Sequence, residues 1–297
     1  MFALIDFAQV VLNGVLIGLV YGIIALSFVV IYRASRVVNL AQGELLVLGG
    51  FLVWSFTVGL GIPLWAGVLI ALLVSVLAGM LVERTVFRPL IGQPMFSVVI
   101  ASIGLMILLR GLMQVVWGAA TVGFPEVIPR GSVFIGPFYF NTTLLIGAGL
   151  TLVVVALLQW YFHRTDSGLR LTAVAEDHAT ALSMGISVRR SGAIAWGLGM
   201  CLATLGAVIL FSGGSLGLSN ATIGFVALPV ALLGGLESVR GAPIAGVLVG
   251  VGEALSSVYL DPFTSGAMSM VFPYLLMIAV LLIRPQGLFG WKVIERI

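Results

Sequence analysis

The sequence predicts an all-α protein, a polytopic bundle of transmembrane helices that can include broken or re-entrant helices, and three observations predict it. Hydrophobic residues make up 61% of the 297 residues and charged residues only 8%, whereas soluble domains have about 25% charged residues. The mean hydropathy is +1.22. The 38 glycines are typical of membrane helices that pack closely through small residues. We therefore expect a single transmembrane domain over residues 1–297, with about 8–9 spans.

Nine apolar spans follow one another along the chain, and a helix needs about 20 residues to cross a bilayer. The seventh span is short and flanked by glycine, so we expect a partial or broken helix there. The first span is not typical of a cleaved signal peptide, because Asp6 stands where such a segment carries basic residues. The spans cover residues 9–32, 40–58, 62–82, 95–117, 142–162, 191–212, 223–237, 242–258 and 267–283.

Basic residues predict the orientation of these spans. If each span crosses once, twelve of the 14 Lys and Arg residues fall on one face, Arg130 falls on the other, and Arg110 lies within the fourth span. An excess of Lys and Arg marks the cytoplasmic face. We therefore expect the N-terminus outside and the C-terminus in the cytoplasm. The twelve residues are Arg33, Arg36, Arg84, Arg88, Arg164, Arg170, Arg189, Arg190, Arg240, Arg284, Lys292 and Arg296.

The long polar interval 163–190 lies between two apolar spans and is expected in the cytoplasm. From Leu169 to Met184, apolar residues recur at three- and four-residue steps, which predicts one amphipathic helix. Asp166 or Ser167 can cap its start, and Gly185 can end it. Such a helix suits docking to another protein, and the pattern fits a surface helix that only stabilises the loop equally well. Its apolar stripe comprises Leu171, Val174, Ala175, Ala179, Leu182 and Gly185.

Polar residues at membrane depth are costly and therefore mark candidate sites. Asn39, Gln42, Gly43 and Glu44 open the second span, and the first three share a helical face by their spacing. One interpretation is a polar wall of a translocation path or a helix hinge. The other is structural, with Asn39 as a helix cap and Glu44 near the positive end of the helix.

Two further charged residues lie within predicted spans. Glu253 lies about two-thirds through the eighth span, and Arg110 lies in the fourth with Gln114 one turn further on. A Glu253–Arg110 pair would satisfy both groups. Glu253 is a further candidate for the translocation path or hinge, although for both residues a structural role is favoured over substrate contact.

Enzyme motifs are absent from the sequence. It contains no HExxH motif, no phosphate-binding Gly-x-x-x-x-Gly-Lys-[Ser/Thr] loop and no Gly-x-Ser-x-Gly elbow. The two histidines, His163 and His178, lack an obvious third ligand, and the single Cys201 excludes a cysteine zinc cluster. We expect no catalytic residues, no metal site, no cofactor on this chain and no nucleic-acid partner. Any ATP use must come from another chain.

Five ordered motifs resemble the permease subunits of branched-chain amino acid ABC importers, specifically the first of their two paired permeases. The motifs span nearly the whole chain, and the departures are Leu40 and Gln42, where the family has Phe and His, and Glu237, where Gly is common. The matching segments are NGVLIGLVYGIIALSFVVIYRASRVVNLAQGELLVLGGF at 13–51, ERTVFRPLIG at 83–92, LRLTAVAEDHATALSMGISVRR at 169–190, ALLGGLESVRGAPIAGVLVGVGEAL at 231–255 and RPQGLFG at 284–290.

The resemblance implies a multi-pass permease of the bacterial inner membrane. It implies a second permease subunit, two cytoplasmic ATPases that carry ATP and Mg, and a periplasmic substrate-binding protein. It also implies that Ala175, Glu176, Asp177, Gly185 and Ile186 form the coupling helix that docks on an ATPase. In the wider importer motif the glycine follows the Glu by six residues, whereas Gly185 follows Glu176 by nine.

Two questions stay open from the sequence. An ATP-independent secondary transporter or channel is the alternative function, in which Glu44 and Glu253 would carry the coupling ions. The substrate is the second question, because the resembling permeases handle branched-chain amino acids, other amino acids, urea, short amides or aromatic acids.

Overall fold

The computed structural model describes residues 2–290, and it confirms an all-α polytopic membrane protein. Seven helices in this part are long and apolar enough to cross a membrane, and two shorter apolar helices, Leu218–Gly234 and Met268–Ile283, join them. Together they correspond one for one to the nine predicted spans. The seventh is short, as predicted, and Pro229 lies inside it. The ninth is short as well, with Pro273 inside it, which the sequence did not predict. Lys292 and Arg296 of the charge analysis lie outside the described residues.

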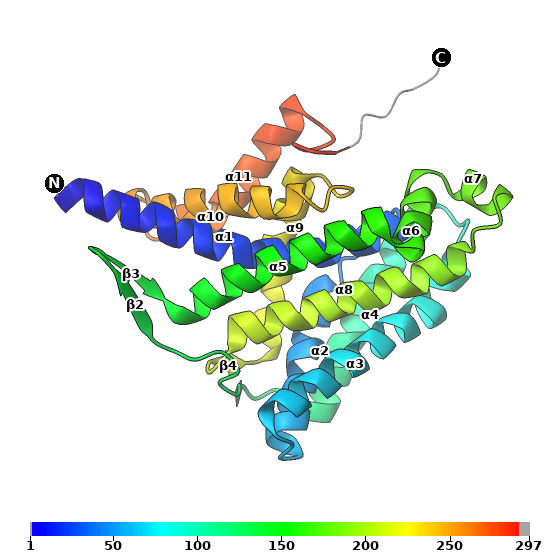
Figure 1. The fold of residues 1–297 in the computed structure, drawn as a ribbon, viewed down its shortest axis with the longest axis horizontal. Helices are drawn as coiled ribbons and strands as arrows, with labels where there is room; N and C mark the ends of the chain where they lie inside the picture. Colours follow the sequence, from blue (N-terminus) through cyan, green and yellow to red (C-terminus); the bar gives the residue numbers. More distant parts are fainter. Residues whose placement is uncertain (1, 291–297) are drawn as a thin grey trace.

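α1 runs through the middle of the bundle, and several of the other helices pack on it (Figure 1). α1 contacts α10, α8, α5 and α9, and α3 packs on α8. The apolar helices are α1 (Phe2–Ser35), α2 (Gln42–Trp54), α3 (Leu64–Val82), α4 (Met95–Trp117), α5 (Thr142–Arg164), α8 (Val188–Phe211), α9 (Ile223–Gly234), α10 (Gly241–Tyr259) and α11 (Met268–Ile283). Short helical turns at Ser55–Gly59, Glu83–Phe87, Arg88–Leu90, η4 (Leu218–Thr222) and Asp261–Phe263 extend or join them.

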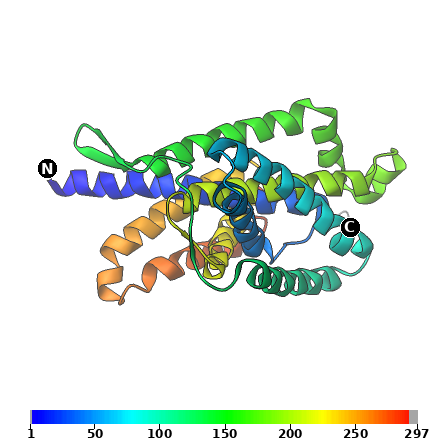
Figure 2. The ribbon, with the colours of Figure 1, turned by 90° about the horizontal axis from the view of Figure 1, so that it is seen from below.

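The predicted outer loops lie together at one end of the molecule. There, β1 (Val122–Gly123) pairs with β4 (Ser215–Leu216), and β2 (Ser132–Ile135) forms a hairpin with β3 (Phe138–Asn141). The hairpin lies beside the start of α1 (Figures 1 and 2), where the side-chain amide of Gln9 exchanges hydrogen bonds with the backbone of Tyr139. These strands were not predicted. β1 and β4 pair backbone groups of two loops that lie about 90 residues apart in the sequence, which periodicity within one segment does not reveal.

The predicted inner loops lie together at the opposite end. Arg33 donates a hydrogen bond from Nη2 to Thr172 Oγ1 (3.0 Å), Arg36 forms an ion pair with Glu237, and Leu288 N donates to Leu233 O (2.8 Å). The segments that the charge pattern assigned to one face are thus neighbours in the fold. We refer to this end as the α6–α7 end, after the two helices described next, and to the other as the β2–β3 end.

The loop 163–190 folds as two helices, α6 (Asp166–Glu176) and α7 (His178–Ser183), so the single helix predicted from Leu169 to Met184 is wrong. The backbone is extended at Asp177, with φ −153° and ψ 117°. The Asp177 carboxylate accepts hydrogen bonds from Thr180 N (3.2 Å) and Thr180 Oγ1 (3.1 Å). A short acidic side chain that bonds to the backbone ahead of it favours a new helix start over continuation of the old one.

Both predicted caps of this segment can be checked. Thr165 caps α6, because its Oγ1 accepts from Gly168 N (3.0 Å); the prediction of Asp166 or Ser167 is wrong by one or two residues. Gly185 does end the second helix, with a left-handed φ of +75°. The predicted stripe is divided by the break: Leu171, Val174 and Ala175 are buried, whereas Leu182 and Gly185 are exposed. The side chain of Ala179 lies outside the described residues.

Candidate functional site

A chain of buried polar side chains marks the start of α2. Asn39 Nδ2 donates to Gln42 Oε1 (3.0 Å), Gln42 Nε2 donates to Ser27 Oγ on α1 (2.7 Å), and Ser27 Oγ donates to Ile24 O. All three polar side chains are at most 2% exposed. Because each donor has an acceptor, burial of these amides does not leave a polar group unsatisfied.

Asn39 does not cap α2, which corrects the structural interpretation given above. The helix begins at Gln42, and Asn39 Oδ1 instead accepts from Ala41 N (3.1 Å), ahead of the first turn. Leu40 N also donates to Ser102 Oγ on α4 (3.4 Å). The turn before α2 is therefore held by side chains, and it joins α1, α2 and α4.

Gly43 lies where the backbone of α2 meets η4 and α9. A methyl group at Gly43 would overlap the carbonyl oxygen of Ala221, and one at Gly224 would lie 2.5 Å from the Gly43 Cα. A narrow cavity beside this contact is lined by Gly43 and Glu44 of α2, Met106 of α4 and Phe225 of α9. The absence of side chains at both glycines lets the two helix backbones touch.

Glu44 forms an ion pair with Arg110 of α4, with 3.0 Å between Glu44 Oε1 and Arg110 Nε. Glu44 is 3% exposed, whereas the Arg110 side chain is half exposed. The predicted Glu253–Arg110 pair is therefore wrong. Helical spacing could not distinguish the two acids, because the packing of α2 against α4 decides which one Arg110 reaches.

Glu253 lies at a different helix junction, where Tyr21 OH of α1 donates to Glu253 Oε1 (3.2 Å). Four of the five candidate path or hinge residues, Asn39, Gln42, Gly43 and Glu44, are thus brought together at the start of α2. The fifth, Glu253, is not. Ser27, Ser102 and Tyr21 were missed by the sequence analysis, because a single hydroxyl in an apolar span is no signal by itself.

The residues that the resemblance assigns to coupling lie at the α6–α7 end. Ala175 is fully buried, Glu176, Asp177 and Gly185 are exposed, and Ile186 packs against a small core formed by Val174, Ala181 and Val188. Leu182 is 60% exposed and Met184 76% exposed beside them. This short element thus has one anchored face and one apolar edge without cover in the described chain.

Arg36 connects the segment 166–186, which comprises α6, α7 and the turn after them and is called the coupling segment below, with two other elements. It ends α1 in a left-handed backbone conformation (φ +56°), which is uncommon for a residue with a side chain. Its guanidinium forms the ion pair with Glu237 in the α9–α10 loop and donates from Nη2 to Glu176 O at the end of α6 (3.2 Å). Glu237, which departs from the family pattern, thus has a structural partner. Arg36 thus links the end of α6 to both α1 and the α9–α10 loop.

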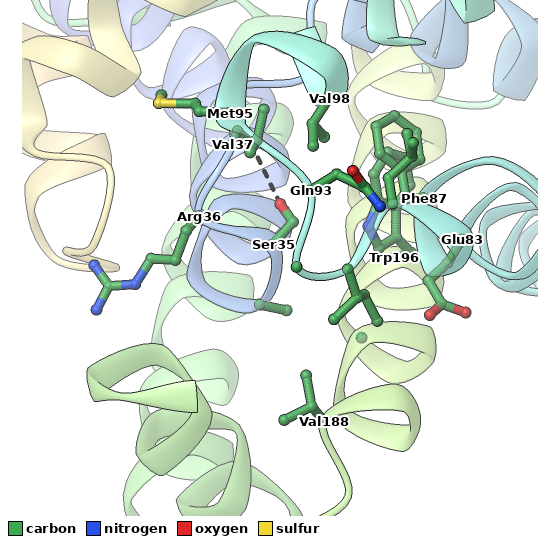
Figure 3. A pocket seen from close by; sticks show the side chains of 15 residues that line it. Ser35, Arg36, Val37, Glu83, Phe87, Gln93, Met95, Val98, Val188 and Trp196 are labelled. Atoms are coloured by element: carbon green, nitrogen blue, oxygen red, sulfur yellow. Dashed lines mark hydrogen bonds between the residues drawn. The ribbon is translucent and has the colours of Figure 1, made fainter. Parts of the chain in front are cut away.

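A cavity of about 320 Å³ lies next to the start of α8, the helix that follows α7. Figure 3 shows Phe87 and Trp196 side by side at its wall, Gln93 directed toward them and Arg36 directed away. The two rings are stacked with 4.3 Å between centroids, and Glu83 accepts from Arg88 Nε (3.1 Å) and Nη2 (2.6 Å). The cavity leaves space beside Val188, where the coupling segment enters the bundle.

Comparisons with known proteins match the chain over almost its full length. The family described as "Branched-chain amino acid transport system / permease component" matches residues 10–281. The chain is 29% identical to the high-affinity branched-chain amino acid transport system permease protein LivH of Escherichia coli K12, over 98% of each chain. It is 28% identical to the corresponding protein BraD of Pseudomonas aeruginosa, over 98% of each chain. A solved structure of PsaBC from Streptococcus pneumoniae in complex with Fab aligns over 96% and 97% of the two chains, at 17% identity and a TM-score of 0.49.

Proposed function

The chain belongs to the family of branched-chain amino acid transport system permease components, and on that premise we propose that it is the transmembrane permease subunit of an ATP-binding-cassette importer. It is a transport subunit and not itself an enzyme. Its substrate is a branched-chain amino acid or a related small polar solute, as the names of its relatives suggest. The membrane is the bacterial inner membrane, with the N-terminus outside and the C-terminus in the cytoplasm.

The observation that carries this proposal is the uncovered apolar edge of the α6–α7 segment. Leu182 and Met184 are exposed at an end of the molecule that is otherwise rich in arginine. Apolar side chains exposed in water are typical of a surface that binds another protein. The partner proposed for this edge is one of two cytoplasmic ATPase subunits, which bind ATP and Mg. Ala175, Glu176, Asp177, Gly185 and Ile186 are the proposed coupling residues.

The coupling segment drives the bundle through two connections. Arg36 ties the end of α6 to α1 and to the α9–α10 loop, and α7 leads directly into α8. When the ATPases close, movement of α6 and α7 shifts these helices between inward-open and outward-open arrangements. Such a shift requires different contacts in the two states.

The translocation path follows the start of α2. Its polar residues, Asn39, Gln42 and Glu44, supply buried hydrogen-bonding groups between apolar helices, and Gly43 lets α2 slide or hinge against α9. Arg110 exposes half of its side chain on α4, which suits a face that meets the second permease subunit or the aqueous path rather than lipid. A periplasmic binding protein delivers substrate at the β2–β3 end.

The test is Gly185→Ala in the reconstituted importer. A side chain at a φ of +75° strains the backbone by about 1–2 kcal/mol, and this displaces the coupling segment. We expect at least a tenfold loss of substrate uptake, with membrane insertion and the melting temperature nearly unchanged. Co-purification of the ATPase subunits and ATP hydrolysis are measured in parallel.

The matched control is Gly61→Ala, because Gly61 has a φ of +66°, and like Gly185 it has no atom within 4 Å of an added Cβ. It lies at the opposite end of the bundle, so the same strain should leave uptake unchanged. Normal uptake by the Gly185 variant would contradict the assignment of α6–α7 as the coupling segment. Transport by the purified chain without any ATPase would favour the secondary transporter instead.

A further inference from the structure

Glycines bring α1 and α10 into backbone contact over several turns. A methyl group at Gly14 would lie 2.7 Å from the Val251 Cα, and one at Gly18 would overlap the carbonyl oxygen of Gly246. At the β2–β3 end of this contact the two helices leave a cavity of about 370 Å³ between them. This volume is within the range of small-ligand sites, about 300–1,000 Å³.

The α1 wall of this cavity is one helical face. Gln9, Asn13 and Ile17 line it at four-residue steps, and Tyr21 continues the same row. The α10 wall consists mainly of Gly250, Glu253, Ala254, Ser257 and Val258. Tyr139 of the β2–β3 hairpin and Ser269 of α11 also line the cavity. Gln9 Nε2 donates to Tyr139 O, and Gln9 Oε1 accepts from Tyr139 N. These two hydrogen bonds hold the hairpin beside the cavity.

Glu253 is the only charged residue among the side chains that line this cavity. Its Oε1 accepts one hydrogen bond, from Tyr21 OH (3.2 Å). Its Oε2 is buried and has no hydrogen-bond partner in the described part of the protein. A carboxylate in a membrane span without a cation or a full set of donors is costly, and this one lines the cavity with one oxygen left without a hydrogen-bond partner in the described residues.

The acidic character continues just outside the cavity. Asp261 accepts from Ser269 N (2.9 Å) and Ser269 Oγ (2.6 Å), so a second carboxylate lies directly behind one lining residue. Asp6 is exposed on α1, one turn before Gln9. Lysine, arginine and histidine are not among the lining residues. The negative groups at this end therefore attract cations toward the cavity.

We propose that the cavity between α1 and α10 binds a small organic cation with a primary ammonium group. Glu253 is its counter-ion, and the Asn13 amide oxygen and the Ser257 hydroxyl accept the remaining N–H donors. An ammonium group presents three donors, which matches three acceptors from two helices. An amino-acid zwitterion fits less well, because its carboxylate would lie near Glu253 without a positive partner. The site is thus separate from the polar chain at the start of α2 and does not depend on the proposed transport function.

The test is equilibrium binding to the full-length chain in lipid nanodiscs, measured by isothermal titration with n-propylammonium chloride. Tetramethylammonium chloride, sodium chloride and leucine are the comparison ligands. We expect saturable binding of propylammonium, at least fivefold weaker binding of tetramethylammonium, which lacks N–H donors, and weaker binding of sodium and leucine. Equal or tighter binding of sodium would overturn the ammonium assignment.

Two variants locate the site. Glu253→Gln should weaken propylammonium binding at least tenfold, whereas Asp6→Asn removes a negative charge that lies outside the lining and should weaken binding less than twofold. Asn13→Leu keeps the carboxylate and removes the amide acceptor at nearly the same side-chain size, so it tests the site if the Glu253 variant does not fold. It should weaken binding at least fivefold at an unchanged melting temperature. Unaltered binding by the folded Glu253 variant, or by Asn13→Leu, would overturn the proposal.

Discussion

Two helix junctions in this protein are built from the same parts, a glycine contact with a glutamate beside it. At the α2–α9 junction, Gly43 meets Gly224, and Glu44 pairs with Arg110 from α4. At the α1–α10 junction, Gly18 meets Gly246, and Glu253 has only the hydroxyl of Tyr21. Both glutamates leave Oε2 without a hydrogen bond in the described chain.

The difference between the junctions is the positive partner. A carboxylate with an arginine beside it is neutralised as part of the fold, although the exposed side of Arg110 keeps the pair open to another chain or to water. A carboxylate that has no arginine beside it and that borders an open cavity is better suited to binding a cation. The same residue type at the same kind of helix contact therefore has two different roles, and the neighbouring helix decides between them.

The largest effect is expected at the glycine contact of α2. Gly43→Ala places a methyl group against the carbonyl oxygen of Ala221, which is backbone and cannot move aside alone. Overpacking of this kind costs about 1–3 kcal/mol or more. We expect a lower melting temperature in detergent and at least a tenfold loss of uptake. Gly149→Ala on α5, where an added Cβ has no neighbour within 4 Å, is the control and should change neither.

An intermediate effect is expected when the arginine of the first junction is removed. Arg110→Met leaves Glu44 buried without its cation, which costs about 3–5 kcal/mol in a fully buried pair. Because Arg110 is half exposed, we expect a smaller loss of about 1–3 kcal/mol in unfolding free energy, measured by denaturant titration. Combining it with Glu44→Gln should recover most of this loss. If the double variant were as unstable as the sum of the single ones, the pair would not be coupled.

The smallest effect is expected at the second junction. Tyr21→Phe removes the one donor to Glu253 and should cost about 1 kcal/mol, the usual net value of one hydrogen bond. The same denaturant titration checks it. A loss as large as that of Arg110→Met would mean that Tyr21 neutralises Glu253 as effectively as an arginine does, and the contrast between the junctions would disappear.

The sequence by itself determined the membrane class, the nine apolar helices and the grouping of the basic loops. These properties are local: hydropathy over about 20 residues, and the charge of the segments between, decide whether a helix enters a bilayer and which loops stay together. The family motifs are likewise contiguous stretches of chain. Asn39, Gln42, Gly43 and Glu44 could be found together because they are neighbours in sequence.

Only the tertiary structure decided the partners. Arg110 lies 66 residues from Glu44 and Tyr21 lies 232 residues from Glu253, so no periodicity within one helix relates them. The break at Asp177 also escaped the apolar pattern, because hydrogen bonds from Thr180 to the Asp177 carboxylate start a second helix where the stripe continues. Which glutamate is neutralised and which lines an open cavity depends on how α2, α4, α1 and α10 pack, and packing is a property of the whole bundle.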